Sequence, residues 1–132
     1  MDLWLILTSQ IITMSRQKNK LPVFRLKGKT TVDFLFENGT QTYTKSLNLK
    51  TVVEEQINKL NVGVSVPKRS FKKAVDRNKI KRQLREAVRT LPENLLFSGY
   101  AMVIYKGKTL PSSDDLNANV LSLFESFKNK TN

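Results

Sequence analysis

Apolar residues recur at helical spacing in two stretches of the second half of the chain. The first stretch comprises Ile80, Leu84, Ala87, Val88 and Leu91. The second comprises Leu116, Val120, Leu123, Phe124 and Phe127. Because residues three or four apart lie on one face of a helix, this spacing predicts two amphipathic helices. Pro92 ends the first helix, and residues 111–115 begin the second.

Alternating apolar residues predict strands before and between these helices. The clearest run is residues 60–66, whose apolar face comprises Leu60, Val62, Val64 and Val66. Pro67 ends that strand, and residues 100–105 form another. Residues 40–53 mix Thr, Tyr, Leu and Val with polar side chains, which predicts one or two strands followed by a turn at residues 54–56. The side chains that point one way in this segment are Leu47, Leu49 and Thr51.

A short helix is predicted over residues 30–39. Thr30 or Thr31 can cap its N-terminus, Asp33 lies in its first turn, and Asn38 with Gly39 stops it. Its apolar face comprises Val32, Leu35 and Phe36.

The start of the chain differs from the rest. Residues 1–14 are apolar but too short to cross a bilayer, and Asp2 is unlike the basic opening of a signal peptide. A membrane anchor is the rival interpretation. Met14 directly precedes a basic run, so residues 1–14 could result from an over-early start codon and would then be dispensable. Residues 15–29 are basic and lack apolar periodicity, which predicts an extended arm. We expect residues 1–20 to be a disordered or loosely packed extension and basic arm, and residues 21–130 to form a single domain.

Charge narrows the choice of partners and chemistry. The 132 residues include 23 Lys and Arg against 11 Asp and Glu, a net charge of +12, which attracts polyanions such as nucleic acid or, less readily, an anionic membrane surface. The chain has neither His nor Cys. Their absence excludes Ser-His-Asp and Cys-His catalysis, thiolate or imidazole zinc sites, haem ligation and disulfides. Lack of Cys also fits a reducing compartment.

Most of the positive charge lies in residues 68–89. Ten of these 22 residues are Lys or Arg and two are acidic, so the segment carries +8 of the +12. One basic stripe beside the apolar face comprises Arg77, Lys81, Arg85 and Arg89. Lys79 and Arg82 project elsewhere, and Asn78 between cations suits a sugar or a base edge. Such a two-sided helix can contact two phosphate tracks, which favours nucleic-acid binding over a merely solvated face.

The same segment resembles the signature of the bacterial ribonuclease P protein family. That pattern reads apolar-x-x-Ala-x-x-Arg-Asn-basic-aliphatic-Lys-Arg-x-aliphatic-Arg, and residues 71–85 match every fixed position. Residues 62–68 are also similar to the family, as is the early Arg25-Leu26-Lys27 followed by a helix that ends at Gly39. The resemblance covers about residues 24–128, and its central motif is long and specific.

This resemblance implies an α+β fold, a two-layer α-β sandwich with element order αβββαβα and a four-stranded sheet. The basic helix would lie in a left-handed βαβ crossover, contrary to the usual right-handed preference.

The resemblance also implies a function, that of the RNA-binding subunit of ribonuclease P, the endonuclease that removes the 5′ leader from precursor tRNA. The catalytic centre and its magnesium ions would belong to the RNA subunit, so this chain would supply no catalytic residue, metal ligand or cofactor site. Its partners would be the catalytic RNA and the precursor tRNA leader. We expect a cytoplasmic protein without a membrane partner, monomeric before it assembles with RNA.

Family positions carry over to residues of this chain. Those expected to bind the catalytic RNA are Arg77, Asn78, Lys79, Arg82, Lys68, Lys72, Lys73 and Arg89. Those expected to bind the leader are Phe36, Val32, Lys50, Lys81 and Arg85. Lys79 stands where the family commonly has Arg, Val32 and Lys50 stand where it has aromatics, and the loop before the motif lacks a usual glycine. Leader contact would therefore rely less on stacking and more on charge.

Two other functional classes stay open at this point, a structural RNA-binding protein such as a ribosomal protein and a metal-dependent nuclease that acts alone. The long motif disfavours the first. The second lacks a ligand cluster, because adjacent acidic pairs at residues 54–55 and 114–115 diverge and Asp76 is better explained as a cap or ion partner. The aromatic residues predicted mostly for the core are Phe34, Phe36, Tyr100, Tyr105, Phe124 and Phe127, of which Phe36 is an equal candidate for a binding cleft.

Overall fold

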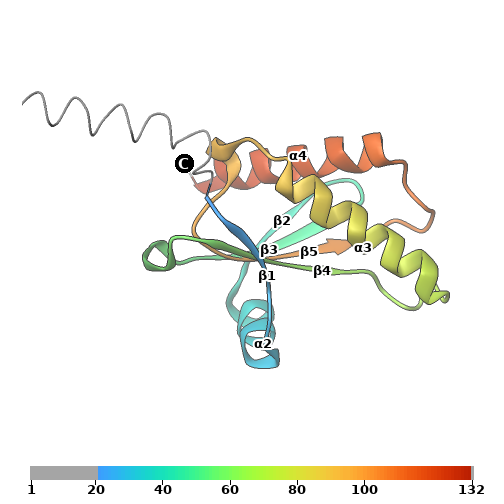
Figure 1. The fold of residues 1–132 in the computed structure, drawn as a ribbon, viewed down its shortest axis with the longest axis horizontal. Helices are drawn as coiled ribbons and strands as arrows, with labels where there is room; N and C mark the ends of the chain where they lie inside the picture. The colour runs from blue at the N-terminus through green and yellow to red at the C-terminus, as the bar shows by residue number, and fades with distance from the viewer. Residues whose placement is uncertain (1–20, 132) are drawn as a thin grey trace, which may run out of the picture.

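The computed structural model describes residues 21–131 (Figure 1). The predictions for residues 1–20 concern a segment outside this range. The elements in chain order are β1 (Val23–Arg25), α2 (Lys29–Asn38), β2 (Thr40–Tyr43), β3 (Leu47–Val53), β4 (Leu60–Ser65), α3 (Ala74–Arg89), β5 (Gly99–Tyr105) and α4 (Ser113–Thr131). Single 3₁₀ turns at Glu55–Ile57 and Glu93–Leu95 precede β4 and β5.

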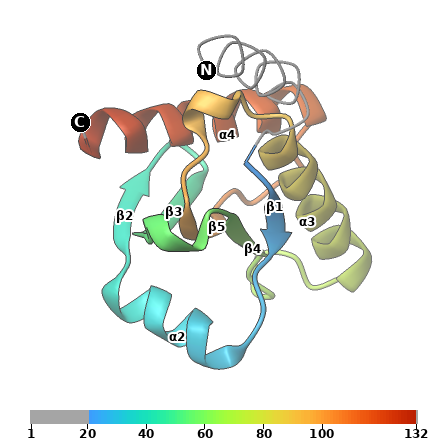
Figure 2. The same ribbon diagram turned by 60° about the vertical axis from the view of Figure 1, so that its left-hand side comes forward.

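The strands form one mixed sheet in the order β1-β4-β5-β3-β2. β4 pairs in parallel with β1 and with β5, whereas β3 runs antiparallel to both β5 and β2. Because β4 and β5 are parallel neighbours, α3 is the crossover helix between them. Figures 1 and 2 show α3 and α4 over one face of the sheet and α2 on the opposite face. The predicted α+β fold with a single sheet is confirmed, and α2 adds a third layer to the expected two-layer sandwich.

The sheet has five strands where four were expected. The additional strand is β1, which lies within the segment predicted as an extended arm and pairs from Val23 opposite Leu60 to Arg25 opposite Val62. Three residues are too few to show an alternating pattern, so no sequence signal marked this strand. Residues 23–25 form a strand because they pair with β4, and β1 is the edge strand of the sheet on this side.

The main core lies between the sheet and the pair α3 and α4. All ten apolar positions predicted from helical spacing are buried, with 0–4% of their surface exposed. The strands contribute the buried side chains Leu47, Leu49, Leu60, Val62, Ala101 and Val103. Each large side chain stabilises the fold by roughly 1.5–3 kcal/mol on burial. The core therefore holds α3 rigidly on the sheet with its cations turned outward.

The opposite face is covered by the short helix α2, which buries Leu35. Phe34 and Phe36 on this helix are 50% and 40% exposed, so the prediction of Phe34 as a core residue is wrong, and Phe36 takes the exposed position of its two alternatives. Within residues 21–131 no second helix lies beside it, and its other side chains are exposed except those of Thr31 and Val32, which are partly buried.

The ends of α2 depend on two glycines. Gly28, with φ of 91°, is the N-cap, and no threonine side chain caps the helix, which corrects the prediction of Thr30 or Thr31 and places Asp33 beyond the first turn. The helix stops as predicted at Asn38, where the Gly39 N–H donates to the Leu35 carbonyl oxygen at 2.8 Å. A Cβ on Gly39 would lie 2.5 Å from that oxygen. Glycine therefore lets the end of α2 approach β3 closely.

Candidate nucleic-acid interface

The helix α3 sorts its cations by exposure, as its spacing predicted. Lys79 and Arg82 are exposed, whereas Lys81 and Arg85 are partly buried beside the apolar face. Lys79 and Arg82 also line a hollow of about 430 Å³ between α3 and α4. The helix thus presents cations on two sides of its buried apolar face.

The loop before α3 carries three exposed lysines, Lys68, Lys72 and Lys73. It is fixed to the domain by Phe71, whose buried ring lies 5.9 Å from that of Tyr105. Arg77 braces the same loop, because its Nη1 donates to the carbonyl oxygens of Phe71 at 2.7 Å and Lys72 at 2.9 Å. Arg77 therefore positions the loop lysines, a role that the motif alone did not reveal. Asn78, the next residue, is exposed.

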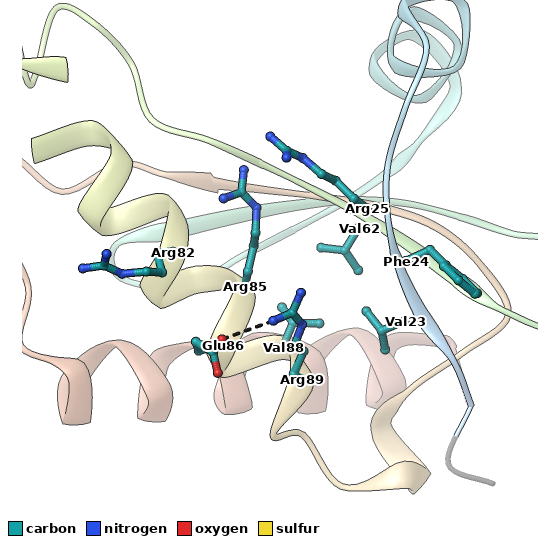
Figure 3. A pocket seen from close by; sticks show the side chains of 9 residues that line it. All are labelled: Val23, Phe24, Arg25, Val62, Arg82, Arg85, Glu86, Val88 and Arg89. Carbon is teal, nitrogen blue, oxygen red and sulfur yellow. Dashed lines mark hydrogen bonds and ion pairs between the residues drawn. The ribbon is translucent and has the colours of Figure 1, made fainter. Parts of the chain in front are cut away.

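Between β1 and the last turns of α3 lies a cavity of about 300 Å³, which we call the arginine groove (Figure 3). Its charged lining comprises Arg25, Arg82, Arg85, Arg89 and Glu86. The rest of the lining is apolar and comprises Val23, Phe24, Val62 and Val88. Figure 3 shows the side chains of Arg25, Arg85 and Arg89 on the side of α3 that faces β1, whereas the guanidinium group of Arg82 points away from β1.

The arginine groove is an unfavourable environment for the positive charge of Arg85. Burial lowers the pKa of Arg85, and the neighbouring charges of Arg25 and Arg89 lower it further. Glu86 offsets little of this repulsion, because its Oε1 pairs with the Arg89 Nη1 at 3.2 Å and both side chains are 62% exposed. A phosphate group would relieve the repulsion and accept the planar guanidinium donors.

Sequence reasoning did not include Arg25 among the binding residues. The side chain belongs to β1, the strand that the pattern did not predict, and its cross-strand partner Val62 shows that it points to the α3 face of the sheet. The available sequence signal was the basic run Arg25-Leu26-Lys27. Only the fold shows that Arg25 faces the arginines of α3 across the groove.

A second candidate surface lies on the α2 face of the sheet. The Lys50 Nζ donates to the Phe36 carbonyl oxygen at 3.1 Å and lies 4.6 Å from the centroid of the Phe36 ring. Val32, one turn earlier on α2, is partly buried. The structure thus brings Phe36 and Lys50 together, as a cation over an aromatic ring.

The five residues expected to bind the leader fall into two groups. Phe36, Val32 and Lys50 belong to the α2 face, whereas Lys81 and Arg85 lie on α3, across the sheet (Figures 1 and 2). Among residues 21–131, no group of three or more His, Cys, Asp or Glu side chains is arranged to hold a metal ion. Within the same residues, no helix has the length and apolar character needed to cross a membrane.

Comparison with known proteins gives one consistent result. The profile of the family described as Ribonuclease P matches residues 22–128. The ribonuclease P protein component of Pseudoalteromonas atlantica (strain T6c / ATCC BAA-1087) is 37% identical over 71 residues, which make up 54% of this chain and 58% of that protein. The chain is therefore matched to somewhat more than half the length of this curated relative.

Two solved structures share the fold. The Staphylococcus aureus RNase P protein superposes with a TM-score of 0.61 at 23% identity, covering 81% of this chain and 94% of that one. The Thermotoga maritima RNase P protein gives a TM-score of 0.56 at 21% identity, covering 80% and 95% of the two chains.

Proposed function

This chain belongs to the ribonuclease P protein family, and from that premise we propose that it is the RNA-binding subunit of ribonuclease P. In this role it assists a catalytic RNA in the endonucleolytic removal of the 5′ leader from precursor tRNA. The proposal includes a cytoplasmic location and a monomeric protein before assembly.

The arginine groove is the observation that supports this role best. It is lined by four arginines of β1 and α3 and by a single acidic side chain. Such a site suits a phosphate backbone, and the whole chain carries a net charge of +12. A protein of this charge can act between two polyanions, the catalytic RNA and the precursor tRNA, by reducing their mutual repulsion.

Catalysis itself is assigned to the RNA subunit and its magnesium ions. The residues of this chain then act by binding and positioning. We assign the outer side of α3, with Lys79 and Arg82, to the catalytic RNA, together with Asn78, Arg89 and the loop lysines that Arg77 braces. The leader is assigned to Phe36, Val32 and Lys50 on the α2 face and to Lys81 and Arg85 on α3.

Charge has a larger share than stacking at Phe36. The Lys50 ammonium group lies over the ring of Phe36, so it covers one aromatic face and offers a cation to a leader phosphate. This arrangement fits contacts that do not depend on leader sequence, because phosphates are the same at every position.

The test is equilibrium binding of precursor and mature tRNA to a bacterial ribonuclease P RNA, with and without this protein. We expect the protein to raise the affinity for precursor tRNA by about tenfold, or 1.4 kcal/mol, and to leave the affinity for mature tRNA nearly unchanged. An equal effect on both tRNAs would contradict leader binding and indicate a structural RNA-binding protein.

A further inference from the structure

The two groups of expected leader-binding residues are separated by the sheet, and a single RNA strand that contacts both must pass around an edge. The edge strand beside the arginine groove is β1. Its residues Phe24 and Arg25 are neighbours in the chain and point to opposite faces of the sheet (Figure 3). Both residues line the arginine groove, and both also line a second hollow of about 660 Å³.

This second hollow combines an aromatic ring with cations. Phe24 is 52% exposed, and the Lys59 Nζ lies 5.3 Å from the centroid of its ring. Tyr100 and Lys27 also line the hollow, and its lining includes no carboxylate. We call Phe24, Lys59 and Tyr100 the edge platform. An exposed ring beside cations is the combination on which single-stranded RNA stacks its bases and places its phosphates.

Strand register places the edge platform on the same face as Lys50. Phe24 pairs with Asn61, and Asn61 pairs with Tyr100. Lys50 pairs with Met102, two residues along β5 from Tyr100 and therefore on the same face. From β3 to β1 the path crosses three strand spacings, roughly 14 Å, a distance that a few nucleotides span.

We propose that the edge platform is a stacking site for a nucleotide of the precursor tRNA leader, and that it guides the leader from the α2 face around β1 to Arg25 and Arg85 in the arginine groove. This inference rests on the proposed function and adds a subsite to it. The site recognises an unpaired base by its flat face and adjacent phosphates by Lys59 and Lys27, without reading base identity.

The experiment measures the affinity of the assembled holoenzyme for precursor tRNAs whose leaders are lengthened one nucleotide at a time. Phe24→Ala should weaken binding about fivefold once the leader reaches the edge platform, at the lower end of what loss of one base–aromatic stack causes. Phe24→Tyr, which keeps the ring, should retain the affinity. Since Lys50 lies on the same face but three strand spacings away from β1, Lys50→Ala should show its own loss at a different leader length.

Phe34→Ala is the matched control, because Phe34 is also an exposed phenylalanine, 50% accessible, and it is absent from the linings of both hollows. Thermal melting of each variant checks that the fold is intact. Three results would overturn the inference. Phe24→Ala could weaken binding no more than Phe34→Ala does, it could weaken the binding of mature tRNA equally, or it could impair assembly with the catalytic RNA instead. A wild-type holoenzyme that prefers precursor tRNA while Phe24→Ala has no effect leaves the proposed function intact. A wild-type holoenzyme without that preference overturns both.

Discussion

At the scale of single residues, Arg85 shows that the arginine groove brings like charges together at a cost to stability. Arg85 is partly buried and its pKa is lowered by burial, then by Arg25 and Arg89. The side chain remains protonated at neutral pH in both the folded and the unfolded chain, so folding brings a charge into a less favourable environment. Binding sites often carry such local strain where the fold must meet a charged partner.

Arg85→Met should therefore raise the thermal midpoint of the free protein at low ionic strength. Methionine keeps a long apolar stem against the groove but removes the charge. The gain should shrink as salt is added, because the screening length falls from about 10 Å at 0.1 M to about 3 Å at 1 M. Melting curves at both salt concentrations measure the effect.

The comparison variant is Lys79→Met, which removes an exposed cation of the same helix and should change the midpoint less. The same Arg85 variant should bind RNA more weakly. A lower midpoint for Arg85→Met at every salt concentration would show that the guanidinium stabilises the free fold.

The sequence predicted the position of a side chain where that position follows from the residue type and from its spacing along a helix. The exposed Lys79 and Arg82 and the partly buried Lys81 and Arg85 lie as their helical positions indicated. Arg77 was placed among the RNA-binding residues, yet its Nη1 donates to two loop carbonyls, which no spacing rule shows. Phe24 and Lys59 are 35 positions apart, and only strand pairing brings them together.

At the scale of elements, apolar periodicity predicted the long helices α3 and α4 and missed the short strand β1. The 16 residues of α3 and 19 residues of α4 repeat their apolar positions over several turns, so both helices and their buried faces were identified. The three residues of β1 have no pattern of their own and become a strand through hydrogen bonds to β4. The exposure of Phe34 was also missed, because the sequence does not show how much of the surface of a helix other elements cover.

The two sides of α3 should give separable defects. Lys79→Ala with Arg82→Ala should mainly weaken assembly with the catalytic RNA, and Lys81→Ala with Arg85→Ala should mainly reduce the preference for precursor over mature tRNA. If each side chain contacts one phosphate, each pair should lower the salt slope of its own binding step by roughly two.

Arg82 also lines the arginine groove, so single variants of Lys79 and Lys81 give the cleaner contrast. Salt titrations of assembly and of tRNA binding separate the two steps. Identical defects of both pairs in both titrations would refute the division of the helix into two sides.

At the scale of the whole molecule, the sheet separates two charged surfaces. The α3 face holds the arginine groove, and the α2 face holds Lys50 over Phe36. If both surfaces bind RNA as proposed, they can do so at once, because the core between sheet and helices fixes their relative positions. A net charge of +12 on this rigid frame suits a protein that holds two polyanions together.

The most direct test of this role is cleavage of precursor tRNA by a bacterial ribonuclease P RNA across a magnesium titration, with the RNA alone, the protein alone and both together. If the chain is the protein subunit, the protein alone cuts nothing, and its addition lowers the magnesium concentration that the RNA needs for half-maximal cleavage. Cleavage by the RNA-free protein, or a magnesium requirement that the protein leaves unchanged, would contradict it.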